Sequence, residues 1–333
     1  SLMPWFCLTA LLHTIIVLEK RNIYQSWTII LSIATFSLSM SGTFLVRSGI
    51  LNSIHTFAND PSRGIFILCF LFALVLLAII IFFIFQKKIT KKLNNPILIS
   101  KETAIIVNNW FLMFFLSVVL IGTVYPIFLD VISSEQISVG PPFYHKLIIP
   151  FLIPFLIFMA IGPQLRWIKS GLDGKIYLTF LLIISFVISF LILKNFGKDL
   201  LFNTILVGSA FYLFLITIRD FLNKKLKNIS QNLSHFGFSL LILSILFNNI
   251  FSREIITNLK VGEKFTNDKF QIVFSDLKKF EEKNYVSFKG YFLITENETE
   301  DQLEPELRVY NQPNIITSEA DIKTSFLTDK FIT

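Results

Sequence analysis

The sequence has little charge and few residues of the kinds that commonly carry catalysis. Only 16% of its 333 residues are Asp, Glu, Lys or Arg, whereas about a quarter are charged in an average soluble domain. It contains no CxxC pair, no Ser/His/Asp order, no glycine-rich phosphate loop and no carboxylate pair within an apolar run. These absences argue against a soluble globular enzyme, a thiol redox protein and a nucleotide-binding enzyme.

Cysteine and histidine are also scarce, with two and four residues respectively. Cys7 and Cys69 both lie inside apolar runs, and we expect each to be a buried, inert thiol. The isoelectric point of about 9.3 raises the question of nucleic acid. However, the Lys and Arg residues stand in short clusters between apolar runs, so we interpret them as signals of membrane topology and expect no nucleic-acid partner.

Long apolar runs are what the sequence has in place of charge: 53% of the residues are hydrophobic and 38 are Phe. About 20 apolar residues are needed to cross a bilayer as a helix, and lipid cannot satisfy an open backbone. The predicted fold is therefore an all-α polytopic membrane bundle, followed by a small all-β extracytoplasmic domain. The eight predicted spans are residues 2–18, 27–46, 64–86, 104–126, 147–167, 176–193, 200–219 and 232–251.

The loop charges set the expected orientation. The loops after the first, third, fifth and seventh spans hold 14 Lys and Arg residues, whereas the alternate set holds five. The positive-inside rule places the first set in the cytoplasm. The loops at 48–63, 127–146 and 194–199 and the C-terminal tail are then outside.

The tail, residues 253–333, differs from the rest in charge and pattern. It carries 11 Lys and Arg against 15 Asp and Glu, while residues 1–252 carry 19 against 8. Segments such as KFQIVFSDL and YVSFKGYFLITENE alternate apolar and polar residues, which indicates strands. The tail has no His, Cys, Met or Trp. We therefore predict a β domain without a metal site or a thiol nucleophile, suited to docking a partner.

Two histidines lie inside predicted spans, where an ionisable residue marks a candidate functional site. His13 is six residues from Glu19, and His235 is four residues from Gln231, which places both about 6–9 Å from the same membrane face. Two imidazoles at one depth on two helices are what bis-histidine ligation of a haem iron requires. The alternative is a hydrogen-bonded structural histidine on each helix, and spacing alone favours it slightly.

A third histidine, His55, stands in the outside loop GILNSIHTFANDPSRG, whose apolar residues recur at the spacing of a short interfacial helix. Its imidazole could meet an external ligand, and Arg47 and Arg63 on either side could pair with carboxylates such as haem propionates. A surface histidine with arginines that anchor the helix fits equally well. His145 in VGPPFYHK is expected to be a structural residue of a surface loop.

Several of these strings together resemble one family. They are SLMPWFCLTALLHTIIVLEKR, TFLVRSGILNSIHTFANDPSRGIF, VGPPFY, HFGFSLLILSI and the tail pattern VGEKFTNDKFQIVF, NYVSFKGYF, LEPELRVY and SEADI. In them the chain resembles the cytochrome c-type biogenesis protein F family (CcmF), the haem lyase of the cytochrome c maturation system. The similarity extends over the whole chain.

The resemblance implies haem ligands. His13 and His235 stand where that family ligates a stable b-type haem within the membrane. His55 stands at one of two outside histidines that ligate the haem being delivered. The other histidine, and the tryptophan-rich WWD segment that holds the haem face, would precede Ser1. We therefore expect the sequence to be the C-terminal portion of a longer protein, or one chain of a split one.

The resemblance also implies an enzyme and its partners. The expected activity is that of a holocytochrome c synthetase, which joins haem to the CxxCH motif of apocytochrome c. Haem would arrive from a haem chaperone (cytochrome c maturation protein E), and the apocytochrome from a thiol-reducing, presenting partner (maturation proteins H and I). A quinol would reduce the membrane haem. The membrane would be a bacterial inner membrane, with a mitochondrial inner membrane as the other option.

Two other functions fit the bare sequence. A haem or small-molecule transporter is consistent with eight spans, although no inverted repeat or paired broken helices are evident. A quinol-oxidising cytochrome b subunit would share the bis-histidine haem but would need neither His55 nor an outside β domain.

Overall fold

The computed structural model describes residues 2–48, 60–89, 97–133, 137, 139–168, 171–172, 174–195, 199–223, 229–267, 270–296, 299–311, 315–326 and 328–333. The chain divides into two compact units, Ser1–Ser252 and Arg253–Thr333. The first unit is helical and the second is made of strands, as the two sequence patterns predict, and the fold class is confirmed.

Eight helices make up the described part of the first unit, and each is long and apolar enough to cross a membrane. Their bounds are α1 Leu2–Arg21, α2 Gln25–Arg47, α3 Pro61–Ile89, α4 Lys101–Ser133, α5 Pro141–Ile161, α6 Lys175–Leu193, α7 Leu200–Asn223 and α8 Ile229–Phe251. A short 3-10 helix, Gly162–Gln164, follows α5.

The start of the fifth helix differs from the prediction. It begins at Pro141, six residues before the expected span, with Gly140 as its extended N-cap. Proline is well suited to the first helical position because its missing N–H would be unpaired there anyway. His145 consequently lies in a helix, where its side chain is exposed, rather than in a loop.

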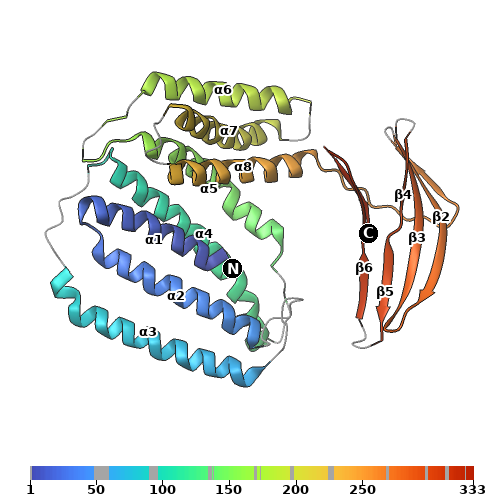
Figure 1. The fold of residues 1–333 in the computed structure, drawn as a ribbon, viewed down its shortest axis with the longest axis horizontal. Coiled ribbons are helices and arrows are strands. Elements are labelled where there is room, and N and C mark those ends of the chain that lie inside the picture. Colours follow the sequence, from blue (N-terminus) through green and yellow to red (C-terminus); the bar gives the residue numbers. More distant parts are fainter. Residues whose placement is uncertain are drawn as a thin grey trace. The chain divides into compact units, whose positions relative to one another are not determined.

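The helices pack in an order that departs from the chain order (Figure 1). Neighbouring pairs run α3–α2–α1–α4–α5–α7, and α7 also packs against α6 and α8. The centrally packed α7 buries Val207, Leu213 and Ile216. By contrast α3, the most hydrophobic of the eight, exposes most of its large side chains. Such a helix needs apolar surroundings beyond the helices described here.

Cys69 lies on α3 and is exposed like most of the large side chains of that helix. Cys7 on α1 is buried, so the expectation of burial is wrong for Cys69. An apolar run does not reveal whether a helix meets protein or lipid.

A buried ion pair holds the end of α1 against the start of α4. The Nε of Arg21 lies 2.9 Å from Oε1 of Glu102, whose side chain is only 2% exposed. The backbone N–H of Ile168 donates to the same carboxylate at 3.1 Å. Glu102 thus joins three segments at the membrane face that the loop charges assign to the cytoplasm.

The strand unit is built on one antiparallel sheet in the order β1-β2-β3-β5-β6, with β4 pairing β3, and a separate pair β7-β8. The long β2–β3 hairpin carries a bulge between Phe274 and Asp276. Described strand bounds are β1 Lys264–Thr266, β2 Phe270–Glu281, β3 Tyr285–Glu296, β4 Thr299–Leu303, β5 Glu306–Tyr310, β6 Ile315–Glu319, β7 Asp321–Thr324 and β8 Asp329–Ile332.

Candidate functional site

His13 and His235 come from two helices that do not pack directly along their lengths. His13 lies on α1 and His235 on α8, and α4, α5 and α7 connect the two through successive contacts. Both side chains are half-buried. The electrostatic surroundings of His235 include the ring of His13 and the ammonium group of Lys101. The fold thus brings the two predicted ligands into one region.

The helix ends show that the two histidines share a depth. His13 is eight residues before the end of α1, and His235 is six residues after the start of α8. At 1.5 Å per residue, these positions lie about 9–12 Å from the helix ends on the same face.

An asparagine on α4 contacts the first histidine. Nδ2 of Asn108 lies 3.2 Å from Nδ1 of His13, and Oδ1 of Asn108 is buried without a hydrogen-bond partner. With Nδ1 beside the amide, Nε2 is the other ring nitrogen, and it can bind a ligand only in the tautomer whose hydrogen is on Nδ1. Metal-bound histidines usually have their other nitrogen held in this way.

The neighbouring amide fixes α4 against α1. Nδ2 of Asn109 donates to the carbonyl of Ala10 at 3.1 Å and to Oγ1 of Thr14 at 2.9 Å. Asn109 is also a neighbour of the His13 ring, although its Oδ1 has no hydrogen bond of standard geometry. We did not predict either asparagine from the sequence. The signal was an Asn-Asn pair inside an otherwise apolar run.

These residues fit a haem better than a bare metal ion. The described residues include no group of three or more His, Cys, Asp or Glu side chains that could hold a metal ion. A porphyrin supplies four iron ligands itself, so two imidazoles complete the set. The half-buried rings, one of them with an amide beside its Nδ1, suit that role.

The two predicted arginines lie at one corner of the helical unit. Arg47 ends α2 and Arg63 lies in the first turn of α3. The backbone N–H of Asp60 donates to the carbonyl of Arg47 at 3.2 Å, and the Asp60 carboxylate pairs with Nε of Arg63 at 3.1 Å. A hydrogen bond from the Ser62 hydroxyl lowers the pKa of Asp60 most, and the backbone N–H and the charge of Arg63 lower it further. His55, and the interfacial helix predicted around it, lie outside the described residues.

Arg47 also borders a cavity of about 530 Å³ between the start of α1 and the end of α2. Met3, Leu38 and Thr43 line the same cavity. It lies at the helix ends that the loop charges place outside, and Arg47 brings a positive charge to it.

A second cavity, of about 600 Å³, adjoins the histidine site between α1, α2 and α4. Thr14 and Asn109 form its polar wall, and Tyr24, Trp27 and Trp110 provide aromatic surface. Tyr24 has a positive φ of 65° in the three-residue connection between α1 and α2. Burial, followed by the nearby charge of Glu102, raises the pKa of Tyr24, so its hydroxyl stays protonated as a hydrogen-bond donor.

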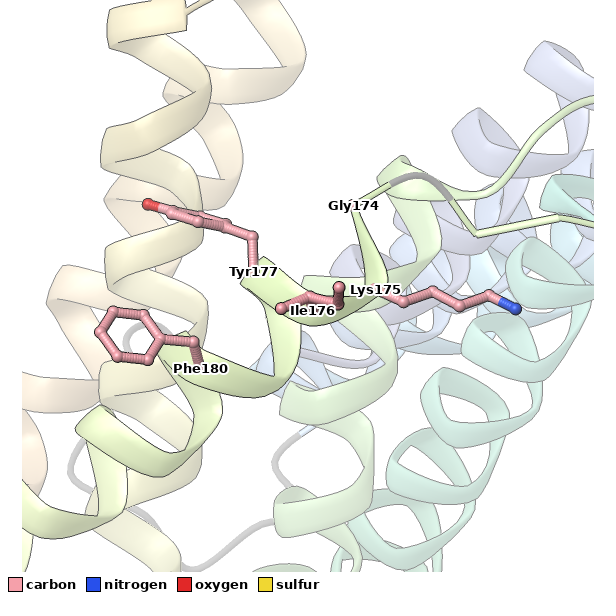
Figure 2. A pocket seen from close by; sticks show the side chains of 5 residues that line it. All are labelled: Gly174, Lys175, Ile176, Tyr177 and Phe180. Atoms are coloured by element: carbon pink, nitrogen blue, oxygen red, sulfur yellow. The ribbon is translucent and has the colours of Figure 1, made fainter.

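A shallower hollow lies at the start of α6 (Figure 2). Figure 2 shows Tyr177 and Phe180 pointing to one side of the helix and Lys175 to the other. The guanidinium group of Arg219 packs over the Tyr177 ring at 4.6 Å. None of the histidines or asparagines described above lines this hollow, so it is separate from the candidate site.

Comparison with known proteins now assigns the family. The model for the CcmF C-terminal beta-sandwich matches residues 250–333, and that for the cytochrome C assembly protein matches residues 1–52. CcmF of Pseudomonas aeruginosa is 33% identical over all of this chain and 53% of its own length. CcmF of Escherichia coli is 31% identical over 99% of this chain and 53% of its own. The chain belongs to the CcmF family.

A solved structure agrees in fold. The protein titled Cytochrome c Heme Lyase CcmF superposes with a TM-score of 0.70 at 19% identity, covering 97% of this chain and 51% of its own. This chain therefore spans about half the length of the CcmF proteins it matches. Its eight apolar helices and its bacterial relatives make it a multi-pass protein of the inner membrane.

Proposed function

We propose that this chain is the part of a cytochrome c haem lyase that holds a b-type haem between His13 and His235 and receives a second haem, the substrate, at the outer surface. The observation that carries the proposal is that half-buried His13 on α1, which contacts Asn108, lies at a depth similar to that of half-buried His235 on α8 and influences it electrostatically, in a CcmF-family chain. A haem bound there would supply one-electron redox chemistry within the membrane.

The reaction adds two cysteine thiols of a CxxCH motif to the two vinyl groups of the substrate haem. Each addition breaks one S–H bond and the π bond of one vinyl group and forms one C–S and one C–H bond, so the addition itself needs no oxidant. The protein's contribution is to hold haem and thiols together, which can lower the barrier by several kcal/mol. His55 would ligate the substrate iron, and Arg47, half-buried beside the outer cavity, would pair with a propionate. Arg63, already paired with Asp60, would serve less directly.

The partners follow from this reaction. A haem chaperone (cytochrome c maturation protein E) would deliver haem at the outer end of α1 and α2. The apocytochrome and its thiol-reducing partner (maturation proteins H and I) would approach the strand unit, which we place in the periplasm from the loop charges.

The electron donor would be a quinol in the cavity between α1, α2 and α4. Its aromatic wall of Tyr24, Trp27 and Trp110 suits a flat ring, and Thr14 and Asn109 offer polar contacts for ring hydroxyls. The quinol would give up two electrons, in two one-electron steps, and two protons as it becomes a quinone. Thr14 directly follows His13, so the ring would lie close to the proposed iron ligand.

The first experiment is an absorption spectrum of the full-length protein purified in detergent, reduced and oxidised. We expect a b-type spectrum that is lost in His13→Ala and in His235→Ala. His145→Ala, an exposed histidine on α5, is the matched control and should keep the spectrum. Full-length protein without haem, or haem unaffected by both changes, would contradict the ligand assignment and favour a transporter.

A second variant separates the lyase from the other two functions. His55→Ala should abolish cytochrome c assembly in cells while the b-type spectrum persists. A transporter or a cytochrome b subunit has no need of that residue, so unchanged cytochrome c assembly in this variant would count against the lyase.

A further inference from the structure

The ring of His13, the proposed iron ligand on α1, can bind iron only in one tautomer, and this step rests on the proposed function. A neutral imidazole carries a hydrogen on one nitrogen and a lone pair on the other. Only the nitrogen with the lone pair can ligate iron. Whichever group meets Nδ1 of His13 therefore decides whether Nε2 is available.

The group at Nδ1 is the amide of Asn108, 3.2 Å away. An amide can present either NH₂ or oxygen to a neighbour, because the two ends have nearly the same shape. With NH₂ toward the ring, Nδ1 must accept and Nε2 carries the hydrogen, which blocks ligation. With oxygen toward the ring, Nδ1–H donates and the lone pair of Nε2 is free. Oδ1 of Asn108 is buried without another partner, so nothing bonded to that oxygen opposes the second orientation.

The surrounding contacts hold Asn108 in place. Asn109, the next residue, is tied to α1 at Ala10 and Thr14, on either side of His13 in the sequence. The hydroxyl of Thr14 donates in turn to the carbonyl of Ala10 at 2.7 Å. Asn109 thus fixes the spacing of α4 and α1 at this level and also lies near the His13 ring, while the amide of Asn108 contacts Nδ1 of that ring.

We propose that Asn108 is a positioning residue for the membrane haem, whose side-chain oxygen accepts a hydrogen bond from Nδ1–H of His13 and directs the Nε2 lone pair to the iron. Groups of this kind set both the orientation and the donor strength of a histidine ligand. Asn108 should therefore influence the haem without touching it.

The test uses the full-length protein and three variants: Asn108→Asp, Asn108→Leu and the control Thr123→Val further along α4. The readouts are the haem reduction potential and the electron paramagnetic resonance spectrum of the oxidised haem. Asp is a stronger acceptor for Nδ1–H, makes the ring a stronger donor and should lower the potential. Leu removes the acceptor and should weaken haem binding about 10–100-fold and raise the potential of the haem that remains. Thr123→Val should match the wild type.

The outcomes separate this inference from the proposed function. Opposite shifts in the Asp and Leu variants support the positioning role. Wild-type potentials and spectra in both would overturn it and leave the haem assignment intact. Loss of haem from Asn108→Asp, which retains an acceptor, would also overturn it. Wild-type protein without haem would overturn both proposals.

Discussion

The helical unit and the strand unit keep their charges in different ways. In the helical unit the pair Arg21–Glu102 is buried, and Glu102 also accepts from a backbone N–H. In the strand unit the described ion pairs, such as Lys279–Glu281 and Lys289–Glu306, join side chains that stay partly or largely exposed. Among its described residues the strand unit buries only three apolar side chains, Ile294, Leu303 and Pro305. It therefore depends more on its backbone ladder than on a deep core.

This difference has an energetic consequence. A charge removed from water costs several kcal/mol unless its partner remains, whereas an exposed pair contributes about 0–1 kcal/mol. The same chemical change should therefore have different effects in the two units, and carboxylate-to-amide substitutions measure that difference directly.

The largest effect is expected at the buried pair. Glu102→Gln removes the charge opposite Arg21 and should lower the free energy of unfolding of the helical unit by about 3 kcal/mol, near the lower limit for a broken buried pair because Arg21 stays 19% exposed. Tryptophan fluorescence of this chain during unfolding reports on the helical unit and not on the strand unit, because all four of its tryptophans lie before residue 253.

The matched control is Glu281→Gln in the strand unit. Glu281 is 71% exposed and pairs with Lys279 at 2.6 Å, so removing its charge should leave the stability of the strand unit nearly unchanged. Hydrogen exchange of the β2–β3 peptides measures this change. Equal losses of stability in Glu102→Gln and Glu281→Gln would contradict the expectation that a buried ion pair contributes more than an exposed one.

A glycine in the strand unit should give the next largest effect. A Cβ on Gly290 would lie 2.8 Å from a ring carbon of Phe292, and Phe292 stacks on Phe274 with ring centroids 4.4 Å apart. Gly290→Ala should force this pair apart and cost about 1–3 kcal/mol, seen as faster hydrogen exchange in β2 and β3. At Gly42 on α2 a Cβ meets no atom within 4 Å, so Gly42→Ala should not destabilise the helical unit in tryptophan-monitored unfolding, because alanine is the better helix former. Unchanged exchange in Gly290→Ala would show that the ring pair is not tightly packed.

The sequence predicts the type of each element in both units, but it does not predict which helices pack against each other. Apolar length predicts helices and period-two alternation predicts strands, because both follow from one element's own periodicity. The common depth of His13 and His235 follows from counting residues. The contact of Asn108 with His13 depends on α4 packing beside α1, which no local pattern encodes. The early start of α5 is indicated locally by the Gly-Pro-Pro sequence at 140–142. Counting apolar residues alone does not detect this signal.

The smallest effect should come from pH acting on the strand unit. Burial alone would raise the pKa of Glu306, but hydrogen bonds from Arg308, Lys289 and Ser287 outweigh it and hold the pKa below its ordinary value. A lowered pKa stabilises the fold above the unfolded value of about 4.3, and that contribution is lost as pH falls through the folded pKa. The pKa of Lys289 is raised, chiefly by its hydrogen bond to Glu306, so its contribution is complete at neutral pH and disappears only in alkali.

The loss of stability in acid should therefore come from protonation of the Glu306 carboxylate. Between about pH 6 and about pH 3, the protection of the β3–β5 amides against hydrogen exchange, corrected for the intrinsic exchange rate at each pH, should fall more in the wild type than in Glu306→Gln, by an amount worth less than about 1 kcal/mol. Glu300→Gln, an exposed position on β4, should behave like the wild type. If Glu306→Gln keeps the full acid sensitivity, the network around Glu306 does not set it. In that case the exposed ion pairs of the sheet would contribute nothing measurable to stability. The difference between the two units would then come from the buried Arg21–Glu102 pair alone.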